Sequence, residues 1–279
     1  MMIAAVILKE RAALVEPALD RALPPADTAP HSLHAAMRHL MFPAGKLFRP
    51  VLAIAGAEAV GAPPEHALPI ATAVELVHTY SLIHDDLPCM DDDAERRGRP
   101  AVHVAFGEAV AVLAGDALLA LAFEVLGDGP GEAVALLATS RDLAAVAGSR
   151  ELVGGQVDDI AFDSASANLG SVESIHWRKS AALIELAIVG GARLGGADAE
   201  QIEQLRRFGR STGMAFQIAD DLLDADENDP CSFLHFATPE EARARAESLL
   251  AGALGEIERW GPDAEPLREL ARFAVRRSE

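Results

Sequence analysis

Acidic side chains gather in one short segment of the first half of the chain. Asp85 and Asp86 are followed by Asp91, Asp92 and Asp93, so five carboxylates fall within nine residues. Carboxylates this close repel one another and resist ionising together unless a cation lies among them. Oxygen ligands without a histidine–cysteine grouping favour Mg²⁺, which usually takes one or two carboxylates together with substrate oxygens. The segment therefore predicts a magnesium site shared with a phosphorylated ligand.

A second acidic group lies far downstream, on a segment with helical spacing. Its polar members recur at i, i+3, i+4 and i+7, which places them on one stripe of an α-helix: Gln217, Asp220, Asp221 and Asp224. Phe216 and Leu222 flank this stripe. Burying a row of carboxylates beside apolar side chains is costly unless a cation offsets the charge. We therefore expect the two acidic groups to hold one polyphosphate from opposite sides.

Basic side chains accompany the acidic ones. Arg96 and Arg97 follow the first acidic segment, and Lys46 and Arg49 stand three apart where a new helix should begin. Guanidinium groups match phosphate geometry. Cations at a helix start oppose the helix dipole, so a bound anion would help to explain them. The alternative for Lys46 and Arg49 is two solvated surface charges, and the same alternative applies to the acidic rim that ends at Glu95.

The two acidic motifs, taken together, resemble those of the trans-type isoprenyl diphosphate synthases, with the bacterial farnesyl diphosphate synthases as the nearest likeness. The first reads Asp85-Asp86-x4-Asp91 followed by Arg96-Arg97-Gly98, and the second reads Asp220-Asp221-x2-Asp224. The resemblance implies a prenyltransferase that joins isopentenyl diphosphate to an allylic diphosphate, dimethylallyl or geranyl. It also implies Mg²⁺ as the cofactor and a homodimer as the assembly.

The resemblance also assigns roles to individual residues. It implies metal binding by Asp85, Asp86, Asp91, Asp220 and Asp224, with Asp221 and Lys179 completing the catalytic set. It implies that the allylic diphosphate is held by Arg96, Lys179 and Gln217, with Ser180 beside them, and isopentenyl diphosphate by Lys46, Arg49, His78 and Arg97. A satisfied core histidine is the alternative for His78. Gln156, in a segment that resembles the family's GGQxxD motif, could donate to substrate or satisfy backbone.

Three segments depart from the family pattern. In the signature GGKRxRP, Ala44 replaces a glycine and Leu47 replaces the middle arginine, which removes one positive charge. In the histidine–lysine–threonine element, Ser180 stands in place of threonine. After Asp224 the family usually has a long lysine-bearing loop, but residues 225–233 contain no lysine. The missing loop favours a non-catalytic subunit of a heteromeric prenyl synthase as one alternative. A class I terpene cyclase is the other, although a cyclase needs no isopentenyl site.

Product length should depend on the side chains beneath the first aspartates. Tyr80 and Ser81 precede Asp85 by five and four residues, so Tyr80 lies about 7.5 Å down the helix. A bulky ring at that depth would stop a growing chain early, and in the family an aromatic residue here accompanies the fifteen-carbon product. We expect farnesyl diphosphate, with ten- and twenty-carbon products as alternatives.

The composition favours helices, because Ala and Leu dominate and aromatic residues make up only 5% of the chain. We expect an all-α fold in which residues 1–279 form one domain, a bundle of roughly ten or more helices around a central apolar active-site cavity. Residues 101–127 read as a nearly all-round apolar helix, which is typical of the middle of a bundle.

Charge and cysteine content narrow the possible partners. A formal net charge of −19 argues against nucleic acid. Cys89 and Cys231 form no disulfide framework and no metal-binding spacing, which fits a reducing cytoplasm. No apolar window is long enough to predict membrane insertion, and the apolar start of the chain lacks a signal-peptide pattern. We therefore expect a cytoplasmic protein.

Overall fold

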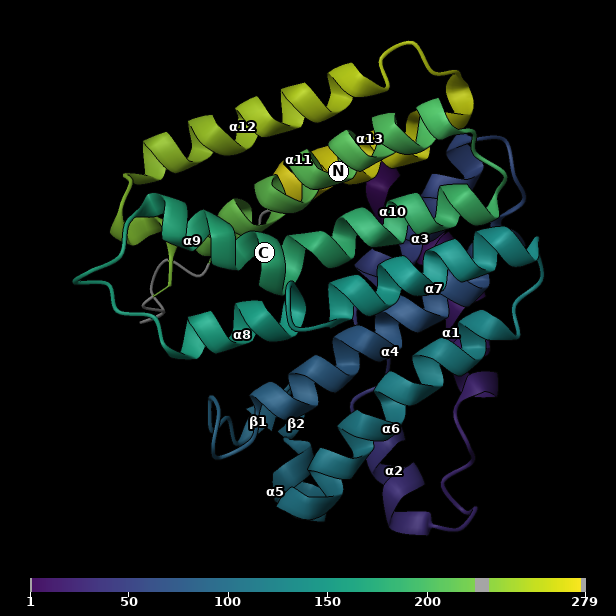
Figure 1. Ribbon diagram of the computed structural model, residues 1–279, viewed down its shortest axis with the longest axis vertical. Coiled ribbons are helices and arrows are strands. Elements are labelled where there is room, and N and C mark those ends of the chain that lie inside the picture. Colours follow the sequence, from purple (N-terminus) through teal and green to yellow (C-terminus); the bar gives the residue numbers. More distant parts are fainter. Residues whose placement is uncertain (1, 224–230, 277–279) are drawn as a thin grey trace.

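The computed structural model describes residues 2–223 and 231–276, and helices make up most of this part of the chain (Figure 1). The α-helices are α1 (Met2–Ala22), α2 (His31–His39), α3 (Phe48–Ala59), α4 (Leu68–Asp85), α5 (Val102–Phe106), α6 (Glu108–Gly127), α7 (Ala133–Ala147), α8 (Leu152–Ile160), α9 (Leu169–His176), α10 (Ala182–Leu194), α11 (Ala199–Leu223), α12 (Pro239–Glu256) and α13 (Glu265–Arg276). Short 3₁₀ turns are η1 (Pro64–Ala67), η3 (Phe233–His235) and η4 (Pro262–Ala264), and η2 (Trp177–Ala181) is a π-helical turn. The all-α prediction is confirmed.

Helices α3 and α10 cross at the centre of the bundle. A Cβ atom on Gly191 would lie 1.9 Å from the carbonyl oxygen of Ala53, and one on Gly56 would lie 2.4 Å from that of Ile188. Only glycine allows the two backbones to approach this closely. The crossing fixes two parts of the site, because Arg49 lies in the first turn of α3 and η2 leads directly into α10.

Helix α6 does not lie in the middle of the bundle, so the interpretation of residues 101–127 was wrong in this respect. Ala111, Ala114 and Leu118 are buried on the face of α6 that meets α4, but Val112 and Leu113 are exposed on the other face. By length and composition, α6 is the one helix among the described residues that could cross a membrane. No such segment was expected from the sequence. A third of the stretch that meets this criterion is buried within the bundle. Its packing against α4 is that of a bundle helix with one uncovered apolar face.

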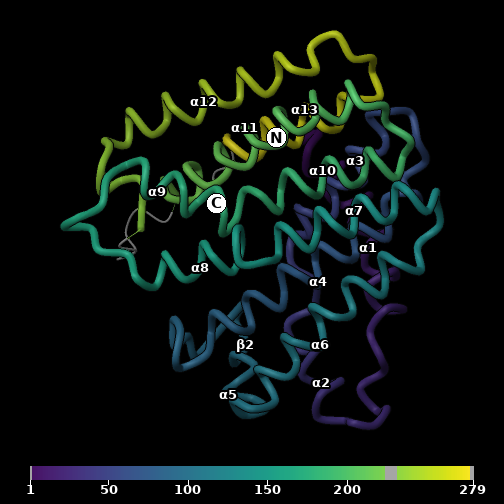
Figure 2. The backbone as a smooth tube through the Cα atoms, viewed as in Figure 1, coloured from purple at the N-terminus to yellow at the C-terminus, as the bar shows by residue number. Residues whose placement is uncertain are grey.

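The remaining helices enclose this centre. Figure 2 follows the chain into α12, which packs along α11, and on to α13. The Ala-rich stretch 132–152 is divided between α7, which ends at Ala147, and α8, which begins at Leu152. A small antiparallel hairpin, β1 (Glu95–Arg96) and β2 (Arg99–Pro100), was not predicted.

Candidate active site

The chain folds back at the end of α4. Pro88 disfavours helical geometry at Leu87, and α4 ends at Asp85. The backbone nitrogen of Asp91 then donates to the carbonyl oxygen of Asp85 at 2.8 Å. Burial raises the pKa of Asp85 to about 7, the charge of Lys179 lowers it and the charge of Asp91 raises it. The carboxylates of Asp85 and Asp91 are therefore close enough to repel one another, as the acidic motif predicts.

Asp86 and Arg96 form a pair of their own. The carboxylate of Asp86 is fully buried, and its Oδ1 accepts from Arg96 Nε at 2.9 Å and Nη2 at 2.5 Å. Asp93 accepts from the same Nη2 at 2.7 Å. Arg96 pairs with Oδ1 of Asp86 only, and the buried Oδ2 has no hydrogen-bond partner among the described residues. The pair with Arg96 favours a supporting role for Asp86; metal binding by Asp86 and diphosphate binding by Arg96 stay predictions. Asp92 and Glu95 are exposed, as expected of an acidic rim.

The second motif lies at the C-terminal end of α11. Gln217, Asp220 and Asp221 are partly exposed there. The Oδ2 atom of Asp221 accepts from the backbone nitrogen of Phe233 at 2.5 Å and from Ser232 Oγ at 3.3 Å. The segment that returns from the second motif is thus docked on Asp221. Asp224, assigned to the catalytic and metal-binding sets, lies outside the described residues.

The α9–η2 element lies close to both motifs. His176 Nε2 lies 3.9 Å from Asp221 Oδ2 and 2.9 Å from the carbonyl oxygen of Cys231. Three residues later, Lys179 interacts electrostatically with Asp85 and Asp91. The two acidic motifs therefore flank one element, at the end of the bundle where α4 and α11 both terminate (Figure 1).

Lys179 also has a partner that sequence reasoning missed. Its Nζ lies 2.6 Å from Asp159 Oδ2. Burial opposes the charge of Lys179, but Asp159 and Asp85 outweigh it and raise the pKa of the ammonium group. Asp159 is the final aspartate of the GGQxxD-like segment, which was the available signal. Gln156 in that segment is 7% exposed, and Ser180 is partly exposed.

A cavity of about 460 Å³ brings together the four residues assigned to isopentenyl diphosphate: Lys46, Arg49, His78 and Arg97. Arg49 Nη1 lies 3.5 Å from His78 Nε2. Burial lowers the pKa of His78 well below its usual value, and the neighbouring guanidinium of Arg49 lowers it further. The imidazole is therefore neutral near pH 7. Leu47, which stands where the family has an arginine, is 2% exposed.

Arg97 is fixed in this cavity by its surroundings. It occupies a left-handed backbone conformation (φ 56°) in the turn of the hairpin. Its Nη1 donates to the carbonyl oxygen of Leu40 at 3.0 Å, and its Nη2 lies 3.8 Å from Glu75 Oε1. A Cβ atom on Gly45 would lie 2.9 Å from the guanidinium carbon of Arg97. The absence of a side chain at Gly45 therefore makes room for this cation.

Tyr80 lies buried beneath the first aspartates, as predicted. Its ring is 4% exposed and its hydroxyl donates to the carbonyl oxygen of Ala147 at 3.5 Å. The ring of His84 meets it edge-on at 5.8 Å. The hydroxyl of Ser81 donates to the carbonyl oxygen of His78 at 2.9 Å. Tyr80 thus spans from α4 to α7, although its control of product length stays a prediction.

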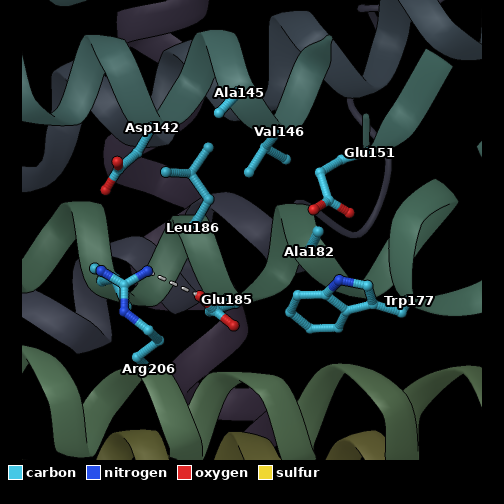
Figure 3. Close-up of a pocket in the computed structure, with 10 residues that line it drawn as sticks. Asp142, Ala145, Val146, Glu151, Trp177, Ala182, Glu185, Leu186 and Arg206 are labelled. Atoms are coloured by element: carbon cyan, nitrogen blue, oxygen red, sulfur yellow. Dashed lines mark hydrogen bonds and ion pairs between the residues drawn. The ribbon is translucent and has the colours of Figure 1, made fainter. Parts of the chain in front are cut away.

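A second cavity, of about 160 Å³, contains none of the predicted site residues. Figure 3 shows Glu151 and Trp177 at one end and Asp142 and Arg206 at the other, with Glu185 between them. Glu185 Oε1 lies 3.2 Å from Arg206 Nη1. Burial raises the pKa of Glu185 to about 7, against the opposing charge of Arg206. No sequence motif marks this acid.

The aspartates near α4 suit a divalent cation in their chemistry. Burial raises the pKa of Asp91, and the charge of Asp159 adds to it. The charge of Asp91 likewise raises the pKa of Asp85, because the two carboxylates repel one another. A cation between them would relieve this repulsion. Within residues 2–223 and 231–276, no three acidic, histidine or cysteine side chains converge closely enough to form a complete metal site.

The chain is similar to proteins of known class. The profile of the polyprenyl synthetase family matches residues 30–230. A heterodimeric geranylgeranyl pyrophosphate synthase large subunit 1 of Arabidopsis thaliana is 47% identical over 225 residues, which cover 78% of this chain and 60% of the relative. Geranylgeranyl pyrophosphate synthase 7 of the same plant is 40% identical over 286 residues, covering 96% of this chain and 82% of that protein. The chain thus spans about three fifths of the length of some of its curated relatives.

Among solved structures, an FPP/GFPP synthase from Zymomonas mobilis superimposes with a TM-score of 0.90 at 35% identity. That match covers 98% of this chain and 99% of the other. The family resemblance noted in the sequence is thereby confirmed. The farnesyl product is not, because these relatives are named for products of different lengths.

Proposed function

The chain belongs to the polyprenyl synthetase family, and we propose that it catalyses the head-to-tail condensation of isopentenyl diphosphate with an allylic diphosphate. The observation that supports this function best is the cationic cavity of Lys46, Arg49, His78 and Arg97, placed beside the end of α4 that carries the first aspartate motif. A terpene cyclase would have no use for such a cavity. The proposal therefore assigns one diphosphate to the cavity and a second to the aspartates.

In this function the cavity holds and aims isopentenyl diphosphate. The guanidinium groups of Arg49 and Arg97 pair with phosphate oxygens, and Lys46 adds a third positive charge. His78, neutral near pH 7, can donate a hydrogen bond without adding charge. Phe48 and Phe216, whose rings stack at 5.2 Å, form the apolar wall of the same cavity. The hydrocarbon part of the ligand would rest on this wall.

The allylic diphosphate would lie between the two aspartate motifs. Lys179 donates to its oxygens, and Asp85, Asp91 and Asp220, with Asp224 and Asp86 in support, are the residues that would hold Mg²⁺. Mg²⁺ bound there would act as a Lewis acid on the departing diphosphate. The bond between the allylic carbon and oxygen breaks, the double bond of isopentenyl diphosphate forms the new carbon–carbon bond, and a proton is lost to the released diphosphate. The apolar helices exclude water that would quench the allylic cation.

We propose farnesyl diphosphate as the product, because the buried ring of Tyr80 stands beneath Asp85. Geranyl and geranylgeranyl diphosphate are the alternatives, the second supported by the names of the plant relatives. The test is an assay of the purified chain with Mg²⁺, isopentenyl diphosphate and either dimethylallyl or geranyl diphosphate, with product length read by mass spectrometry. Turnover that depends on isopentenyl diphosphate is the expected result. Its absence would favour the non-catalytic subunit.

We also propose a homodimer. Exposed apolar side chains occur on α6 (Val112 and Leu113), on α7 (Val134 and Leu137) and on α8 (Val153, Val157 and Ile160). These three helices lie towards the viewer in Figure 1. Exposed apolar surface of this kind is typical of an interaction site. Leu137→Glu should yield a monomer in analytical ultracentrifugation, whereas Ile3→Glu, an exposed apolar residue of α1, should not. A wild-type chain that sediments as a monomer would argue instead for a different partner subunit.

A further inference from the structure

Glu75 is a buried carboxylate in a cavity built for an anion. It lies on α4, one turn before His78, and only 3% of it is exposed. Its partner is Arg97 Nη2, at 3.8 Å, which is too long for a hydrogen bond. Among the described residues no hydrogen bond to this carboxylate is found. A buried acid with one loose ion pair is expensive to keep ionised.

The positive charges that line the cavity with Glu75 come from three segments of the chain. Arg97 belongs to the hairpin turn, Arg49 to α3, and Lys46 to the loop before α3. Burial raises the pKa of Glu75, and the charges of Arg97 and Arg49 oppose that rise. His78, on the same helix, is neutral near pH 7 because its pKa is lowered. The ionised form of Glu75 therefore depends on the same cations that would bind a diphosphate.

We propose that Glu75 is the internal counter-charge of this cavity and takes up a proton from solvent when a diphosphate enters. The inference rests on the proposed function, because it assumes that a diphosphate binds here. The entering phosphate oxygens would engage Arg49 and Arg97 and bring like charge close to the carboxylate. The carboxylate then becomes a neutral acid. In the empty cavity Glu75 holds the guanidinium groups in place, and in the filled one it no longer repels the ligand.

Isothermal titration calorimetry with isopentenyl diphosphate alone tests this inference without any turnover. The titration is run in two buffers of different ionisation enthalpy, at a pH where the diphosphate is already fully ionised, so that proton uptake comes from the protein. The wild type should take up more protons per bound ligand than Glu75→Gln, by up to about one proton. Glu58→Gln is the matched control: Glu58 is a partly buried glutamate on α3 that pairs with Arg11 and does not line the cavity. It should behave as the wild type does.

His78→Asn separates the two groups that could accept the proton. Uptake that persists in Glu75→Gln but vanishes in His78→Asn would assign the proton to His78 and overturn the proposal.

A measurement on the wild type alone tests the proposal even if Glu75→Gln does not fold. With one proton taken up, the affinity should fall up to about tenfold per unit rise in pH, and affinity and heat that depend on neither pH nor buffer would overturn the proposal. A wild type that binds no isopentenyl diphosphate would overturn the proposed function as well, whereas binding without uptake overturns this inference alone.

Discussion

The ammonium group of Lys179 lies 2.6 Å from the carboxylate of Asp159, on the element that separates the two aspartate motifs. Burial alone would favour the neutral amine, but Asp159 and Asp85 raise the pKa of Lys179 and keep it charged. Asp159 therefore keeps the charged ammonium group of Lys179 next to the aspartates. A bound diphosphate could replace Asp159 as the partner of this ammonium group.

Lys179→Met should remove this cation while keeping most of the side-chain volume. We expect kcat/KM for the allylic diphosphate to fall by about 10²-fold or more, the usual effect of removing a donor that faces developing negative charge. Arg178→Met is the matched control, because Arg178 pairs with the half-exposed Asp158 next door. Steady-state kinetics with each substrate varied in turn measure both variants. Equal losses in the two variants would show that Lys179 acts only through local charge.

Tyr80→Ala should lengthen the product, because it removes the buried ring beneath the first aspartates. Tyr80→Phe keeps the ring and loses only the long hydrogen bond to Ala147, so it should leave the product unchanged. Mass spectrometry of the extracted products gives the chain lengths. If both variants made the wild-type product, another residue would have to limit the length of the product.

Local rules of the sequence predicted much of this architecture. Pro88 disfavours helical geometry at Leu87, and α4 does end beside the aspartates, where Asp91 folds back on Asp85. The spacing of Lys46, Arg49 and His78 said nothing by itself about their convergence, which depends on the family pattern. The cavity confirms that they meet.

Other features depend on packing that a single sequence does not reveal. Helix α6 reads as apolar on all sides, and only the fold shows which face α4 covers and which remains exposed. The pairing of Glu185 with Arg206 likewise depends on how α10 packs against α11. The GGQxxD-like motif contains Asp159, but its pattern indicated Gln156 as the polar residue of interest.

Removal of divalent metal should abolish turnover, since the repulsion between Asp85 and Asp91 calls for a cation. Excess EDTA should stop product formation and added Mg²⁺ should restore it. Asp85→Asn should lower kcat by about 10²-fold or more. Asp92→Asn is the control: the residue is exposed and occupies a left-handed conformation (φ 54°) that asparagine tolerates. A large loss in Asp92→Asn would place the metal elsewhere in the acidic segment.

Glu185 should make the protein less stable as the pH rises. Burial raises the pKa of this carboxyl to about 7 in the folded protein, against an ordinary value of 4.5, so the folded state holds its proton more tightly than the unfolded state. The free energy of unfolding therefore falls between about pH 4.5 and pH 7, by up to about 3 kcal/mol for this group. Glu185→Gln should remove that loss.

Urea unfolding at pH 5 and pH 8 measures the difference between Glu185→Gln and the wild type. The variant should be more stable than the wild type at pH 8, and the gain should shrink towards pH 5, where the wild-type carboxyl is protonated in the folded state. Arg206, left behind, is 39% exposed and stays hydrated, so its lost ion pair costs little. Glu203→Gln removes an exposed partner of the same arginine and should change stability little at either pH. A loss of stability in Glu185→Gln that is equal at both pH values would mean that the ion pair with Arg206 outweighs the cost of burying the charge.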